Sequence, residues 1–137
     1  RRIKKLRSYS MNDHLGGAAG TDPRPSPHPS RQYKRNTEFR SPAELFVFLD
    51  IEALSICFIS FETPLNDSLH SCPGALHDKK TGALSYADGH VETHRWKKPV
   101  ARPFPVSPGW DWTAHTLDWD RQDILYIRSR AHHLLSE

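Results

Sequence analysis

The sequence predicts an α+β fold in which a small antiparallel sheet with a central β-hairpin is accompanied by a short C-terminal helix. Residues 82–96 contain two strand-like stretches on either side of an Asp-Gly pair at 88–89. Residues 45–49 and 54–61 are almost entirely apolar, which is typical of buried strands. Apolar residues recur at helical spacing within residues 120–135, and the aspartates at the start of this segment suit the helix dipole.

The hairpin is the clearest local feature of the sequence. An Asp-Gly pair favours a two-residue type I′ turn, because both central residues need positive φ, which glycine adopts freely and aspartate tolerates. This turn would place Tyr86 opposite Val91, so that Leu84, Tyr86 and Val91 share the face that packs on the core. The opposite face, solvated or covered by the C-terminal tail, would then carry Ala83, Ser85, Ala87, His90, Glu92 and His94.

Irregular segments are expected between the regular elements. Residues 6–11 alternate apolar and polar side chains, which predicts a short half-buried strand. Residues 21–31 have proline at every second position from 23 to 29, so we expect an extended loop with polyproline character. Residues 63–74 and 97–109 are also predicted to be loops, since they are rich in proline and other turn-forming residues.

A chain of 137 residues predicts a single domain, here residues 1–137. Its uneven charge divides it into a basic, Gly/Pro-rich N-terminal part, 1–40, and a part that holds the hairpin core and the C-terminal helix, 41–137. The first part has 10 Lys and Arg against 3 Asp and Glu, and the second has 9 against 13. Basic segments attract nucleic acid or anionic lipid, but a solvated arm that docks on the acidic body explains the same pattern. No stretch interleaves arginine with aromatic residues as a single-strand stacking platform does, so we predict no nucleic-acid binding.

The sequence predicts neither a membrane span nor a signal peptide. Its longest uncharged apolar stretch, residues 53–61, has nine residues, whereas a spanning helix needs about 20. The first residues are basic and lead into polar sequence, which is not the pattern of a secretory signal.

The two cysteines, Cys57 and Cys72, leave two alternatives open. In an oxidising compartment, a disulfide across the 14 intervening residues would stabilise the fold by about 3 kcal/mol. In a reducing compartment both are thiols, and Cys57 serves as a small apolar residue in a strand.

Several side chains are candidates for metal binding. His90, Glu92 and His94 fall on one face of one strand and His77 precedes the hairpin, so these four are the candidates for zinc or copper. A polar, solvated hairpin face explains the same residues, and no HExxH motif is present. The candidates for calcium are Asp67, Asp78 and Asp88, although no EF-hand loop is present.

Catalytic motifs are not found, and we predict that the protein is not an enzyme. There is no G-x-S-x-G nucleophile elbow and no phosphate-binding glycine loop. The alternative is a secreted metal-binding protein or a metal-dependent hydrolase that uses His77, His90, Glu92 and His94.

His77 also suggests a structural role. A histidine ten residues before the Asp-Gly turn would reach the carboxylate of Asp88 or a turn carbonyl, and would pin the intervening loop. A shielded contact of this kind would contribute about 1–3 kcal/mol.

The order of these motifs resembles the prepilin-type, processing-associated proteins, which carry a His-x9-Asp-Gly signature and are similar to type II secretion pseudopilins. The resemblance rests first on His77 followed by Asp88, Gly89 and His90, here with a ten-residue spacer and with Leu76 where an arginine commonly stands. Supporting matches lie in residues 7–12, 41–50, 86–91, 111–113 and 123–125.

The resemblance implies the C-terminal globular head of a pseudopilin, in which case we expect the family's N-terminal membrane helix to be missing from this sequence. Such a head would be a structural or interaction subunit of a pilus-like or secretion assembly in the periplasm or at the cell surface. Its partners would be other pilin-like subunits or secretion-apparatus proteins, and it would contact the membrane only through the missing helix. No cofactor is implied beyond calcium, which related heads hold in a loop.

Overall fold

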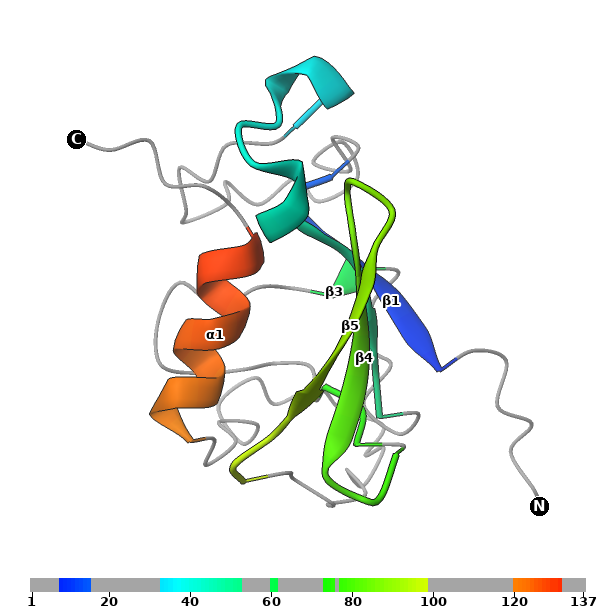
Figure 1. The fold of residues 1–137 in the computed structure, drawn as a ribbon, viewed down its shortest axis with the longest axis vertical. Helices are drawn as coiled ribbons and strands as arrows, with labels where there is room; N and C mark the ends of the chain where they lie inside the picture. The colour runs from blue at the N-terminus through cyan, green and yellow to red at the C-terminus, as the bar shows by residue number, and fades with distance from the viewer. Residues whose placement is uncertain are drawn as a thin grey trace, which may run out of the picture.

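Five strands form one sheet, and a helix packs against one of its faces (Figure 1). The computed structural model describes residues 8–15, 33–52, 60–61, 73–75, 77–98 and 120–131. The strands are β1 (Tyr9–Asn12), β2 (Phe46–Asp50), β3 (Ser60–Phe61), β4 (Thr81–Tyr86) and β5 (Val91–Arg95). Two short 3-10 helices, η1 (Asn36–Glu38) and η2 (Pro42–Glu44), precede β2, and helix α1 (Arg121–Ala131) follows the sheet in sequence.

The strand order is β3-β1-β2-β4-β5. Neighbours from β1 to β5 run antiparallel, whereas β1 and β3 run parallel. A small α+β fold with an antiparallel sheet and a C-terminal helix is therefore confirmed. The predicted central position of the hairpin is wrong, because β4 and β5 form one end of the described sheet and β2 lies at its centre.

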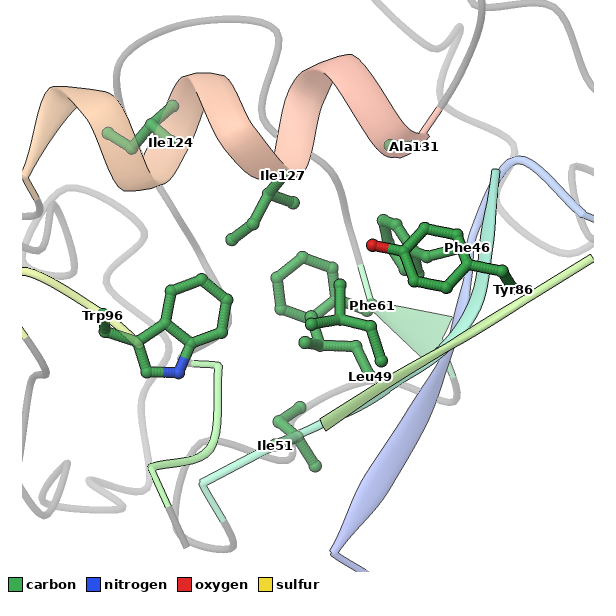
Figure 2. Close-up of a cluster of buried hydrophobic side chains, with 10 residues drawn as sticks. Phe46, Leu49, Ile51, Phe61, Tyr86, Trp96, Ile124, Ile127 and Ala131 are labelled. Carbon is green, nitrogen blue, oxygen red and sulfur yellow. The ribbon is translucent and has the colours of Figure 1, made fainter. Parts of the chain in front are cut away.

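The main core lies between the sheet and α1 (Figure 2). Ile124, Ile127 and Ala131 are buried, so the predicted helical stripe is confirmed within the described part of the helix. Asp120 begins the helix as predicted, because its Oδ1 accepts the backbone N–H of Gln122 at 2.8 Å. The side chains that meet the helix from the rest of the chain are Phe46, Leu49, Ile51, Phe61, Leu84, Tyr86 and Trp96.

The hairpin turn differs from the prediction by one residue. Gly89 donates its N–H to the carbonyl oxygen of Tyr86 at 3.0 Å, and Tyr86 donates to the carbonyl oxygen of His90 at 2.9 Å. The loop therefore has three residues, 87–89, and only its glycine has positive φ, at 96°. This is the geometry of a type I turn followed by a glycine bulge, which an Asp-Gly pair also satisfies.

This difference in register changes the faces of β5. Ser85 is paired with Val91 and Leu84 with Glu92, whereas the two-residue turn predicted Tyr86 opposite Val91. A one-residue slip moves every side chain of a strand to the other face. Val91 is accordingly 64% exposed rather than in the core. The even-numbered residues of β5, predicted on the solvated face, lie on the face that carries Leu84 and the helix.

Trp96 closes one end of the core at a point where the backbone is tightly packed. Its Nε1 donates to the carbonyl oxygen of Gly74 at 3.0 Å. A Cβ on Gly82 would lie 2.3 Å from that oxygen and 3.0 Å from the indole nitrogen. The close approach therefore requires glycine at position 82.

The predicted N-terminal strand is confirmed as β1, although it begins later than expected. Several predictions fall outside the described residues, among them the loop at 21–31, most of the strand at 54–61, both cysteines and the segment 99–119. No helix of the described part of the chain is long and apolar enough to cross a membrane.

Candidate functional site

The polar residues of β5 meet α1 on the core side of the hairpin, and we call this group the hairpin–helix cluster. Because Gly82 pairs with His94 and Leu84 pairs with Glu92, the side chains of His94 and Glu92 are on the helix side of the sheet. The members of the cluster are Tyr86, Asp88, His90, Glu92, His94, Asp123 and Tyr126.

His94 joins β5 to the helix. Its ring stacks on the ring of Tyr126, with centroids 3.7 Å apart and planes inclined by 21°. Its Nε2 lies 3.4 Å from Oδ1 of Asp123, and its ring also contacts Trp96 edge-on. The imidazole is thus held by an aromatic ring on one side and a carboxylate on the other.

Asp123 is buried in the first turn of α1, with 1% of its surface exposed. Its Oδ2 accepts the backbone N–H of Lys97 at 2.8 Å and that of Lys98 at 3.3 Å. A buried carboxylate is tolerated only where donors satisfy it, and here the donors come from the segment that leaves β5. Asp123 therefore ties the end of the hairpin to the start of the helix.

Two tyrosine hydroxyls continue the cluster toward the turn. The hydroxyl of Tyr86 donates to Oε2 of Glu92 at 3.3 Å and lies 3.2 Å from the hydroxyl of Tyr126. Burial, followed by the hydrogen bond to Tyr126, raises the pKa of Tyr86 well above its usual value. The guanidinium carbon of Arg130 lies 3.8 Å from the centre of the Tyr126 ring, on the outer side of the cluster.

The turn itself is held by Asp88 and His90. Nδ1 of His90 lies 2.5 Å from Oδ1 of Asp88, and the same oxygen accepts the backbone N–H of His90 at 3.1 Å. The pKa of the Asp88 carboxyl is lowered most by the hydrogen bond with the His90 side chain and next by the bond from the His90 backbone N–H. The His90 ring stacks on Tyr86 with centroids 4.4 Å apart, and its Nε2 is 3.5 Å from Oε1 of Glu92. Asp88 and His90 therefore hold the turn and connect it to the strands on either side.

His77 lies away from this cluster. It pairs with Thr81 at the start of β4, while the turn is at the other end of that strand, about 20 Å away for six residues. Its Nε2 is instead 3.8 Å from Oδ2 of Asp50. The predicted contact between His77 and Asp88 is therefore wrong.

Of the four zinc or copper candidates, His90, Glu92 and His94 belong to the hairpin–helix cluster, and His77 lies apart from it. Within the described ranges, no three His, Cys, Asp or Glu side chains are grouped as metal ligands would be. Asp78 lies in the turn before β4, where its Oδ1 accepts the backbone N–H of Lys80 at 3.2 Å. A hydrogen bond with the Thr81 side chain lowers the pKa of Asp78. Asp88 lies at the far end of β4, and Asp67 falls outside the described residues.

Three residues of structural importance were not singled out by the sequence analysis. Two of them, Asp123 and Tyr126, connect the hairpin–helix cluster to α1. The sequence did indicate burial of Asp123, because it stands four residues before Ile127 and so lies on the apolar face of the helix. Asn12 is fully buried, and its Nδ2 donates to the carbonyl oxygens of Phe46 at 3.0 Å and Ala131 at 2.8 Å. It satisfies a carbonyl at the end of α1 that the helix itself leaves without a partner.

These contacts define a small α+β domain in which the histidines and carboxylates of the hairpin are engaged in holding hairpin and helix together. No family model, no curated protein and no solved structure matches the chain.

Proposed function

We propose that this chain is a non-enzymatic structural or interaction subunit of a pilus-like or type II secretion-like assembly, working in the periplasm or at the cell surface. The proposal rests on the observation that the residues of the Asp-Gly-His motif, 88–90, build the hairpin turn. Asp88 and His90 bond to each other, and Gly89 provides the positive φ of the turn. A motif whose residues shape a turn suits a subunit that acts by contacting other proteins through its surface.

The segments that carry the family resemblance also contact one another directly, which supports the proposal. The N–H of Ala87, in the hairpin loop, lies 3.1 Å from the carbonyl oxygen of Pro42 and 2.9 Å from that of Leu45. The turn is thereby joined to the segment that leads into β2, and β2 pairs with β1. The described residues of these resembling segments, 8–12, 41–50 and 86–91, thus contribute to one framework.

The sheet face opposite α1 provides a surface for neighbouring subunits. Its exposed large side chains are Tyr9 on β1, Phe48 on β2 and Val91 on β5, with exposures of 56%, 41% and 64%. Tyr9 and Phe48 are in edge-to-face contact, with ring centroids 5.7 Å apart. Exposed apolar groups on one face are typical of a surface that another protein covers.

Photo-crosslinking in the native host tests the proposal. A benzophenone amino acid replaces Phe48 in the full chain, and a control carries it at Lys79, an exposed residue of the turn before β4. We expect envelope-located adducts at position 48, formed with proteins that begin with a basic leader and a long apolar helix, and none at position 79. A chain found only in the cytoplasm, or adducts that lack such proteins, would refute the proposal.

A further inference from the structure

Strand β5 ends the described sheet and directs half of its backbone groups outward. The bonds from Tyr86 to His90 and from Trp96 to Lys80 fix which residues of β5 bond to β4, namely the even-numbered ones. Val91, Thr93 and Arg95 therefore point their N–H and C=O groups away from β4. No strand among the described residues pairs with this edge.

The side chains along this edge leave it accessible. Val91, Glu92, Thr93 and Arg95 are exposed, and His94 is half-buried beneath the helix. An accessible strand edge is a template for pairing with another strand, and native proteins either block it or use it. The strand contains no proline, and the charges at its two ends are opposite in sign, so they complement those of a second β5 that runs antiparallel. Asp88 and Glu92 lie toward the turn, and basic residues follow Thr93.

We propose that β5 pairs with β5 of a second copy of this chain, antiparallel and about a two-fold axis through Thr93. This register uses all three residues whose backbone groups point outward. Thr93 then lies opposite Thr93 of the second copy. Val91 lies opposite Arg95 of the second copy, and Glu92 lies opposite its His94. Threonine pairs and acid–base pairs directly across two strands are both favourable.

The register centred on Thr93 is the symmetric one that pairs all three outward-facing residues with one another, and two of the other registers bring like charges together. An axis through Glu92 places two carboxylates opposite each other, and an axis through Arg95 places two guanidinium groups opposite each other. The antiparallel arrangement also brings the acidic end of each β5 toward the basic end of the other, which includes Lys97. Pairing of the two edges would create one continuous sheet, with the β5 strands at its middle.

Sedimentation velocity of the purified full chain over a range of concentrations tests this inference, which does not depend on the proposed function. We expect a monomer–dimer equilibrium that Thr93→Pro weakens at least about tenfold, because proline removes the central outward N–H without breaking a bond to β4. The matched control, Thr93→Val, keeps the N–H and the branched side chain, and should dimerise like the wild type. Thermal melting followed by circular dichroism checks that each variant is folded.

A second pair of variants tests the register and does not rely on proline. Val91→Glu and Val91→Lys change an exposed residue that would face Arg95 of the second copy. Since the contact occurs twice in a dimer, we expect the glutamate variant to have a dissociation constant about tenfold lower than the lysine variant. A wild-type chain that stays monomeric throughout, or equal dissociation constants for the two variants, overturns the inference. So does a dimer that Phe48→Asp abolishes while Thr93→Pro leaves it intact, because association would then use the sheet face.

Discussion

Replacing Asp123 tests how strongly the hairpin is fastened to the helix. Asp123→Ala removes the acceptor of the Lys97 N–H, at 2.8 Å, and the partner of His94 Nε2, at 3.4 Å. Hydrogen bonds to a charged group contribute about 1.5–3 kcal/mol each, and an orphaned buried donor adds its desolvation cost, so we expect a loss of about 3 kcal/mol. Asp123→Asn keeps the shape and one oxygen acceptor, and we expect about half that loss, roughly 1.5 kcal/mol.

Urea unfolding followed by far-ultraviolet circular dichroism measures these losses. Arg121→Ala is the matched control, since Arg121 is exposed in the same helical turn and should change stability by less than about 0.5 kcal/mol. A double-mutant cycle with His94→Phe, which keeps an aromatic ring on Tyr126, should give a coupling energy of about 0.5–2 kcal/mol. The reasoning fails if Asp123→Ala is as stable as the control, or if the alanine variant is more stable than the asparagine variant.

Three further outcomes are expected. Gly82→Ala should lower the free energy of unfolding in urea by about 2–4 kcal/mol, because its Cβ would clash with the carbonyl oxygen of Gly74. Gly89→Ala has open space around its Cβ but a positive φ, and should lower it by only about 1–2 kcal/mol. Equal losses for the two variants would contradict this reasoning. The raised pKa of Tyr86 means that its stabilising contribution is complete below the unfolded tyrosine pKa and is lost as pH rises above that value. At pH 11 the wild type should therefore lose about 1 kcal/mol of stability that Tyr86→Phe does not lose. Zinc, copper or calcium should leave the melting temperature unchanged, because the described part of the chain brings no three His, Cys, Asp or Glu side chains together as ligands; a saturable rise would favour the metal-binding alternative.

Local sequence patterns predicted several elements of the fold, although not the two short 3-10 helices. The spacing of Ile124, Ile127 and Ala131 predicted the buried face of α1, because a helix brings such positions to one side. The alternation around the Asp-Gly pair predicted the hairpin. It did not determine the register, since the same dipeptide fits both a two-residue turn and a three-residue turn with a glycine bulge.

The candidate site was harder to predict, because its contacts join residues that are distant in sequence. Asp123 bonds to the backbone of Lys97 across 26 positions, and no local pattern marks a backbone N–H as a partner. His90 and His94 of the hairpin were recognised as part of one group, but the register error placed them on the wrong face. Once the turn has three residues, the same alternation that had suggested a solvated row directs His94 against Tyr126.

The hydrogen bond between Asn12 and Ala131 spans 119 positions, and this has a consequence for the order of folding. During synthesis, the strand that contains Asn12 leaves the ribosome long before its last partner is made. Until α1 emerges, the Asn12 amide lacks the acceptor at the helix end, and the sheet lacks Ile124, Ile127 and Ala131 of its main core. Completion of this core therefore waits for the synthesis of α1, and a product that stops before Arg121 should expose apolar side chains of the sheet and aggregate more readily.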